Sequence, residues 1–316
     1  MLNLAACASL LAATPAGAVG LSPGDGERAA RESISRALPR ARLLWVRDEA
    51  IFHTRLGEWL PRRISPAGVS ETRPRWSPDG ARIVFQRGPH TVFVMNGDFS
   101  DPRPVLDGAH TADWTWDGTA VTAISSDGMR VMRHEIATGR TTTLYDAAQP
   151  PYNGQPLAQA AELHPGGRYL AVFRRTPQHA TEIVDLKARR YIANEQMLRG
   201  DCNPAWTPDG RHLLTTARTA NRPILYTPFD PDTGTVAESQ VLANLSSWSR
   251  YYMHDARASN DGKWLVFAGQ ILVGDSMLGR REVYIWRAGD APGAPVRLTF
   301  DTDHDEKPSL FIPLDP

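Results

Sequence analysis

The amino-acid sequence predicts an all-β protein, a six-bladed β-propeller whose blades are four-stranded antiparallel sheets. Three observations predict this fold. A short motif ending in Gly recurs along the chain, each copy belongs to a unit that contains four strand-like segments, and incomplete units lie at both ends. The 25 Gly and 25 Pro among 316 residues also fit a chain of short strands joined by turns.

The clearest copy of the motif is RPRWSPDGARIVF, residues 73–85. Its Asp79-Gly80 pair predicts a tight turn between two strands, because Gly adopts positive φ without a Cβ clash. The turn glycine recurs about every 45 residues, a period typical of propeller blades rather than of helical solenoids. The five turn glycines are Gly80, Gly118, Gly167, Gly210 and Gly262.

Each unit continues beyond these two strands with a third strand, a second turn and a fourth strand. Alternating apolar residues, such as Val92 and Val94, predict strands whose faces pack on neighbouring blades. Third strands are expected at 91–96, 129–136, 180–186, 223–229 and 282–288, and fourth strands at 103–107, 141–146, 189–194, 239–244 and 295–300.

The two ends of the chain together complete one further blade. Residues 42–65 predict the second, third and fourth strands of a blade, and residues 306–312 predict a first strand with nothing after it. Pairing the C-terminal strand with the N-terminal strands closes the ring at six blades and removes two exposed sheet edges. A flat array or two separate sheets would leave both fragments unpaired.

The N-terminal residues 1–20 resemble an export signal, with an Ala/Leu-rich run that ends in small residues. Cleavage after Ala18 is one expectation, and lipidation of Cys7, within a lipobox-like Leu-Ala-Ala-Cys, is the other. No Lys or Arg precedes the run, so a start upstream of Met1 would supply the missing basic region. A disordered or helical tail is the alternative. Residues 21–41 predict a short helical or irregular segment, with the helix at 26–38, and residues 42–316 the propeller.

The composition excludes several classes of protein. Lys plus Arg and Asp plus Glu both number 35, so no nucleic-acid partner is expected. Two cysteines, Cys7 and Cys202, exclude a disulfide framework and disfavour a multi-cysteine zinc site. No transmembrane span is expected after the N-terminal signal.

The pattern Pro-x-Trp-Ser-Pro-Asp-Gly-x-x-Ile-x-Phe at residues 74–85, followed by Val-Phe-Val-Met-Asn at 92–96, resembles the WD40-like repeat of TolB-like β-propellers. The resemblance covers residues 42–312. It implies a periplasmic, monomeric, non-catalytic module that binds an envelope protein or peptide, with a lipoprotein among the candidate partners. The N-terminal α/β domain of TolB has no counterpart, because only about 20 residues separate the signal from the first strand.

Related propellers also occur in enzymes. Prolyl-oligopeptidase-type peptidases carry a Gly-x-Ser-x-Gly nucleophile elbow, and oligogalacturonate lyases a Gln-x-x-His-x-His metal cluster; the sequence contains neither motif. The absence of both motifs favours a binding module, and a metal-dependent polysaccharide lyase or hydrolase is the alternative.

Equivalent positions near the start of each first strand form rings, because this strand lines the central channel of a propeller. Ligands usually meet such a fold at the channel mouths. The repeats align at a Pro or Ala in the first strand, such as Pro74. The first ring lies two residues before this position, and the second ring one residue before it. The first ring contains Thr72, His110, Gln159, Cys202, His254 and Glu306, and the second Arg73, Thr111, Ala160, Asn203, Asp255 and Lys307.

These rings predict a ligand-binding channel mouth in which Arg73 and Lys307 suit a carboxylate. The metal alternative uses His110, His254 and Glu306, residue types that bind a divalent ion such as Ca or Mn. Channel mouths are exposed to solvent, so polar side chains are expected there even without a function, and polarity alone does not establish a site. The candidate ligand-binding residues are Arg73, His110, Asn203, His254, Asp255, Glu306 and Lys307.

Other residues have plainer interpretations. The acidic alternation of residues 301–306 suits calcium but is also the linker into the closing strand. His164 is expected in a turn, and Trp248, Tyr251 and Tyr252 in an aromatic loop beside the mouth. The recurrent Trp76, Trp114 and Trp206 are expected in the core between blades rather than in a sugar-stacking platform.

Overall fold

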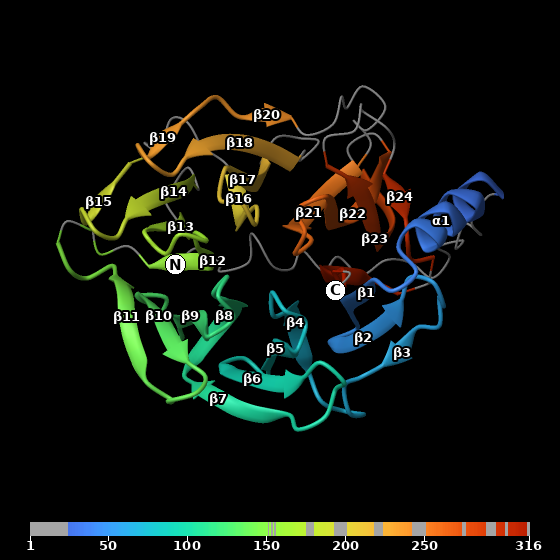
Figure 1. The fold of residues 1–316 in the computed structure, drawn as a ribbon, viewed down its shortest axis with the longest axis horizontal. Helices are drawn as coiled ribbons and strands as arrows, with labels where there is room; N and C mark the ends of the chain where they lie inside the picture. The colour runs from blue at the N-terminus through green and yellow to red at the C-terminus, as the bar shows by residue number, and fades with distance from the viewer. Residues whose placement is uncertain are drawn as a thin grey trace.

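The computed structural model describes residues 25–150, 152, 154, 156–174, 180–192, 201–217, 224–241, 251–273, 276–288, 295–300 and 303–314. Six antiparallel sheets surround a central axis, so the predicted six-bladed β-propeller is confirmed (Figure 1). The first strand of each blade lies nearest the axis, and the other three follow outward in chain order.

The blades are numbered in chain order. Blade 1 contains β25 (Asp305–Phe311), β1 (Arg42–Arg47), β2 (Ala50–Arg55) and β3 (Arg62–Arg63). Blade 2 contains β4 (Glu71–Trp76), β5 (Arg82–Arg87), β6 (Thr91–Asn96) and β7 (Arg103–Asp107). Blade 3 contains β8 (Ala109–Trp114), β9 (Ala120–Ser125), β10 (Arg130–Glu135) and β11 (Thr141–Asp146).

The second half of the ring has the same plan. Blade 4 contains β12 (Leu157–Leu163), β13 (Tyr169–Arg174), β14 (Ala180–Asp185) and β15 (Arg190–Tyr191). Blade 5 contains β16 (Asp201–Trp206), β17 (His212–Ala217), β18 (Ile224–Asp230) and β19 (Thr235–Val236), and β20 (Gln240–Val241) also pairs with β18. Blade 6 contains β21 (Tyr251–Ala258), β22 (Trp264–Val273), β23 (Ser276–Arg287) and β24 (Val296–Arg297).

The recurrent motif forms the turn between the first and second strands. In blade 2, the Ser77 hydroxyl donates to the Asp79 carboxylate at 2.6 Å and accepts the backbone N–H of Arg82 at 2.9 Å. The same carboxylate accepts the N–H of Ala81, and Gly80 completes the turn at φ 67°. Thr or Ser followed two residues later by Asp repeats these bonds in blades 3, 5 and 6, which explains why the motif recurs.

Polar side chains hydrogen-bond three of these turns, those of blades 2, 3 and 5, to the preceding blade. Arg42 of blade 1 donates to the carbonyl of Gly80 at 2.9 Å, and Arg82 of blade 2 donates to the carbonyl of Gly118 at 2.8 Å. Each guanidinium also lies over the recurrent tryptophan of the next blade, at 4.3 Å from Trp76 in the first case. A cation over an indole face adds attraction to the hydrogen bond, so neighbouring blades are held together at these turns.

His164 has this role in blade 4. Its Nε2 donates to the carbonyl of Gly210 at 2.9 Å, while its Nδ1 accepts the N–H of Gly166 in its own turn. The imidazole packs edge-on against Trp206. Trp76, Trp114 and Trp206 are all buried, as predicted for core residues between blades.

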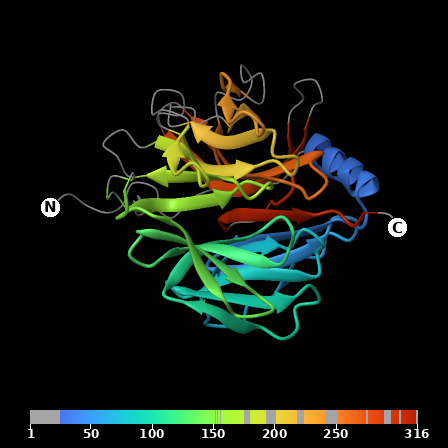
Figure 2. The ribbon, with the colours of Figure 1, turned by 60° about the vertical axis from the view of Figure 1, so that its left-hand side comes forward.

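The ring closes where β25 pairs with β1, as the two chain fragments predicted. Leu44 pairs with Ser309, and Arg47 with Asp305. Figure 2 shows the red closing strand lying beside the blue N-terminal strands. The expected strand at 306–312 is observed one residue earlier, and the strands expected within 42–65 are β1, β2 and β3.

Helix α1 (Asp25–Ala37) precedes the propeller and packs beside β24 and blade 1 (Figure 1). Asp25 and Glu27 in its first turn complement the helix dipole. Pro39 follows its end, and Ile34 buries its inner face in the core that Leu43 and Trp45 share. Within the described residues, no helix is both long and apolar enough to cross a bilayer.

Candidate functional site

A one-residue β-bulge lies in the first strand of five blades, at the place where the two predicted rings lie. In blade 2, Thr72 pairs with Gln86 but Arg75 pairs with Val84, so one extra residue is inserted. In each bulge the residue of the second ring has positive φ although it is not glycine. These residues are Arg73, Thr111, Asn203 and Asp255, each at φ 54°, and Lys307 at φ 53°.

Such a conformation is unfavourable for residues other than glycine by roughly 1–2 kcal/mol. Bulges redirect side chains and occur next to active sites, and strained residues concentrate where function requires them. Blade 4 departs from this arrangement, because two extra residues separate Leu157 from Ala160 and Ala160 lacks positive φ. The second ring is therefore a repeated backbone feature, which the sequence does not reveal.

Charged side chains from blades 6, 1 and 2 meet at this mouth. Lys307 on β25 donates to Glu306 at 2.7 Å and to the Thr72 hydroxyl on β4 at 3.1 Å. Arg281 on β23 donates to the other oxygen of Glu306 at 2.5 Å. Burial alone would raise the pKa of Glu306, but Lys307 and Arg281 outweigh it and lower that pKa, so the carboxylate is charged at neutral pH.

Asp255 on β21 accepts a hydrogen bond from His254 Nδ1 at 3.0 Å. Burial would raise the pKa of Asp255, but His254, Arg73 and Lys307 together lower it. Burial lowers the pKa of Arg73, and Asp255 partly offsets this effect. Arg73 nevertheless makes no hydrogen bond or ion pair with any described residue, so its guanidinium can receive an external carboxylate.

His110 and Asn203 lie in the rings but make no hydrogen bond or ion pair with this charged group. His110 Nδ1 contacts the Thr111 hydroxyl at 2.9 Å, and burial, with repulsion from Arg73 and His90, lowers the pKa of His110 to about 4. It is therefore neutral at physiological pH. Asn203 has the positive φ of its ring and is half-buried.

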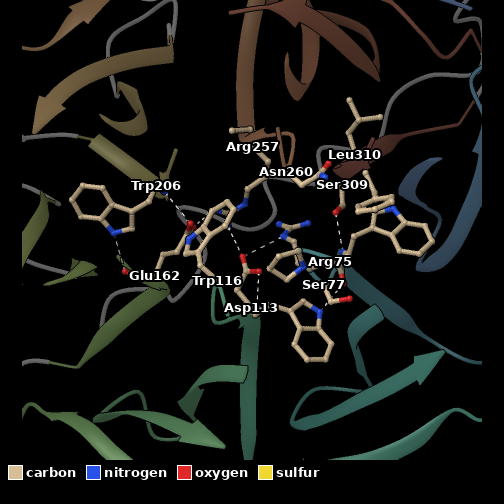
Figure 3. A pocket seen from close by; sticks show the side chains of 15 residues that line it. Arg75, Ser77, Asp113, Trp116, Glu162, Trp206, Arg257, Asn260, Ser309 and Leu310 are labelled. Atoms are coloured by element: carbon tan, nitrogen blue, oxygen red, sulfur yellow. Dashed lines mark hydrogen bonds and ion pairs between the residues drawn. The ribbon is translucent and has the colours of Figure 1, made fainter. Parts of the chain in front are cut away.

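A second layer of charged side chains, which the sequence did not predict, lies farther along the channel. Arg257 of blade 6 reaches across the axis to the carboxylates of Glu162 in blade 4 and Asp113 in blade 3, the latter at 3.8 Å. Arg75 of blade 2 lies 3.7 Å from Asp113. Figure 3 shows these four side chains converging from different blades. They follow the aligned Pro or Ala by one position, and four charges in one repeat slot were the signal that could have revealed them.

Burial and neighbouring charges shift the pKa values of side chains in this layer. Burial raises the pKa of Glu162 to about 7, with Asp113 adding to the rise and Arg257 opposing it. Glu162 also accepts the backbone N–H of Trp206 at 2.9 Å. Burial and repulsion from Arg257 lower the pKa of Arg75 to about 10. The layer spans the channel between the mouth and the turns at its other end.

A cavity of about 70 Å³, large enough for a few water molecules, adjoins this layer, whose four charged residues line it. Trp116 and Asn260 line it beside the charged side chains, and Figure 3 shows both near the network. Asn260 is engaged in the fold, because its side chain exchanges two hydrogen bonds with the backbone of Ile312. The small volume suits solvent rather than an organic ligand.

The described residues contain no group of three or more His, Cys, Asp or Glu side chains placed to hold a metal ion. His110, His254 and Glu306 instead make the separate contacts described above. In the predicted calcium segment, Asp305 is fully buried against Arg47, so its carboxylate faces the blade interior. The geometry gives no support to a Ca or Mn site or to the metal-dependent enzyme.

Several predicted features lie outside the described part of the chain. They include the export segment 1–20 with Cys7, and Trp248 of the aromatic loop. The side chains of Gln159, Cys202, Tyr251 and Tyr252 lie outside it as well.

No family model matches the sequence, and no curated protein matches it. The fold does match solved structures. The putative TolB from Agrobacterium tumefaciens gives a TM-score of 0.58 at 14% identity, over 85% of this chain and 91% of that chain. TolB from Acinetobacter baumannii gives 0.52 at 13% identity, over 96% of this chain and 89% of that chain. A chain of the nidogen/laminin complex gives 0.59 at 9% identity, over 87% of this chain and all of that chain. The expected resemblance is thus confirmed at the level of the fold: the chain is a six-bladed propeller like those of TolB structures.

Proposed function

We propose that this protein is an exported propeller of the bacterial envelope that binds a protein or peptide at the channel mouth without catalysing a reaction. The observation that carries the proposal is the ring of strained, non-glycine residues at the bulges. Two cations, Arg73 and Lys307, and two carboxylates, Asp255 and Glu306, lie on this mouth, and the Arg73 guanidinium makes no hydrogen bond or ion pair with any described residue.

A mouth with both signs of charge suits the termini and polar side chains of a protein better than a single small anion. Charged groups of both signs favour a partner with opposite charges at the facing positions and disfavour a partner with like charges there. Two neighbours in the fold are TolB proteins, and a third comes from a complex between two proteins, nidogen and laminin. These neighbours agree with a binding role, and a lipoprotein of the envelope is the partner we favour.

The test is recovery of partners from envelope extracts with the purified chain as bait. A variant with Arg73→Glu and Lys307→Glu reverses the cationic part of the mouth, and Arg130→Glu reverses an exposed arginine of blade 3 as a matched control. The double variant should lose the partner by at least ten-fold, about 1.4 kcal/mol, whereas the control should retain it. Near-ultraviolet circular dichroism checks that both variants keep the native fold. Equal recovery by all three proteins would contradict the proposal.

Export and the monomeric state belong to the same proposal. Intact-mass measurement of protein from the native cell separates cleavage after Ala18 from lipidation at Cys7. The closed ring favours a monomer, because pairing of β25 with β1 completes blade 1 within one chain and leaves no partial blade for a second copy to complete. Light scattering after gel filtration should give the mass of one chain; a dimer would contradict this part.

A further inference from the structure

A groove of about 850 Å³ lies between blades 1 and 2, at the end of the blades opposite the channel mouth. Gly80, in its wall, follows the end of β4, whereas Arg73 of the mouth lies near the start of that strand. Residues of β2 and of the turn after it form one wall, and the turn after β6 forms the other. The volume lies in the range of roughly 300–1,000 Å³ that is typical of ligand pockets.

One wall of the groove is cationic because of strand register. Arg42 on β1 pairs with Arg55 on β2, and His53 on β2 pairs with Arg62 on β3. Paired residues share a face of the sheet, as do residues two apart, so these four side chains lie on one face of blade 1. All four line the groove. Like charges placed directly opposite repel each other in a sheet, so an anion bound beside Arg42 and Arg55 would reduce this repulsion.

Few anionic groups compensate this wall. Glu58 pairs with Arg55 at 3.1 Å on the surface. Asp98, the other acidic residue of the groove, accepts hydrogen bonds from Ser100 in its own turn. Arg42 donates only to backbone carbonyls, and Arg62 makes no hydrogen bond or ion pair with any described residue. Three arginines and two carboxylates line the groove, so its net charge is one positive charge, which Arg62 carries without an ion pair to any described residue.

His53 adds a polar atom without a partner. Its Nε2 is buried and has no hydrogen bond among the described residues, and its ring lies 4.7 Å from that of Phe99. Burial, with repulsion from Arg42, Arg55 and Arg62, lowers the pKa of His53 to about 4, so the ring is neutral at physiological pH. A neutral imidazole still offers one hydrogen bond from this nitrogen.

The rim of the groove is apolar and strained. Leu60 is 73% exposed, although it is a large aliphatic residue. Phe99, which lines the groove, has positive φ at 73° although it is a bulky aromatic residue. Positive φ is a genuine outlier for residues of this size, and such strain gathers at binding sites. The groove thus joins cationic and apolar contacts within one hollow.

We propose that this groove binds an acidic peptide segment of a partner protein in which apolar residues adjoin the carboxylates. Arg55 and Arg62 receive the carboxylates, and an apolar side chain of the peptide covers Leu60 and Phe99. An inorganic anion would leave the apolar rim uncovered. A polyanion or an anionic membrane would need a broad basic field, whereas this chain has 35 basic and 35 acidic residues. The site is independent of the channel mouth and lies at the other end of the blades.

The test selects binding peptides from a displayed random library of twelve-residue peptides. Selection is carried out on the wild-type chain and separately on a variant with Arg55→Ala and Arg62→Ala. Both arginines are exposed, so the variant should fold, and an unchanged Tm checks this. Arg103→Ala, which removes an exposed arginine of β7 outside the groove, is the matched control. Peptides selected on the wild type should be enriched in Asp and Glu next to Leu or Phe.

Fluorescence anisotropy then measures the affinity of the most strongly selected peptide, carrying a fluorescent label. It should bind the double variant at least ten-fold more weakly than the wild type or Arg103→Ala, and its Asn/Gln counterpart should bind weakly to all three. Arg73→Glu with Lys307→Glu at the mouth should leave binding unchanged. Selection of the same peptides on wild type and double variant, no acidic enrichment, or binding to anionic vesicles in place of peptides would overturn the proposal.

Discussion

Arg47 and Asp305, 258 residues apart in the chain, close the propeller ring with a two-pronged ion pair. Arg47 Nε lies 2.8 Å from Asp305 Oδ1, and a second guanidinium nitrogen lies 2.9 Å from Oδ2. The indole N–H of Trp45 donates to the same Oδ1 at 3.0 Å. Asp305 is fully buried, so its charge depends on these partners.

Asp305→Asn should therefore destabilise the protein strongly. The substitution removes the charge that Arg47 needs, and breaking a buried ion pair from one side costs about 3–5 kcal/mol. The matched control is Asp101→Asn, which breaks the exposed pair with Arg103 and should cost about 0–1 kcal/mol. Urea denaturation measures both; similar losses in the two variants would mean that the pair does not hold the ring closed.

Gly80→Ala should lower the free energy of unfolding for two reasons. Gly80 has φ 67°, and a Cβ there would lie 2.4 Å from Cζ of Phe311 and 2.5 Å from a nitrogen of Arg42. Gly139→Ala is the control, with φ 71° and nothing within 4 Å of its Cβ. The control should cost about 1–2 kcal/mol from φ alone, and Gly80→Ala about 1–3 kcal/mol more from the clash. Thermal unfolding that ranks the two variants equally would contradict the close packing of blades 1 and 2 at this turn.

Glu162 should make stability depend on pH in an unusual direction. Its pKa is about 7 in the folded protein against 4.5 ordinarily, so the unfolded chain releases this proton first as pH rises. The stability that Glu162 contributes is complete below pH 4.5 and is lost as pH rises to 7. Glu162→Gln cannot titrate and keeps an acceptor for the Trp206 N–H. The difference in unfolding free energy, wild type minus variant, should fall between pH 4.5 and 7; parallel curves would contradict the buried environment of the carboxyl.

The sequence predicted the fold because strands, turns and ring closure rest on local patterns. Asp79-Gly80 requires a tight turn whatever surrounds it, and the closing strand at 306–312 follows from counting strands in each unit. The prediction of the fourth strand of blade 6 was less accurate: a strand at 295–300 was expected, but β24 contains only Val296–Arg297. Edge strands depend on pairing with one neighbour alone, so residue patterns specify their ends weakly.

The candidate sites were harder to predict. Ring positions followed from the repeat, but the bulge at Arg73 could not, because no glycine marks its positive φ. The pairing of Arg257 with Glu162 depends on which blades face each other across the axis. The groove depends on the register that places Arg42 opposite Arg55. These relationships arise from three-dimensional closure, which residue spacing along one strand does not encode.

The most direct test of the proposed binding function is photocrosslinking at the channel mouth in the native cell. A photoreactive amino acid at Asn203, half-buried in the ring, should form one dominant adduct with an envelope protein. The same group at the exposed Glu238 of blade 5 should not form it. Arg73→Glu with Lys307→Glu should abolish the adduct. A mouth that crosslinks to nothing, or an adduct that persists at Glu238 or in the charge-reversed variant, would contradict the account.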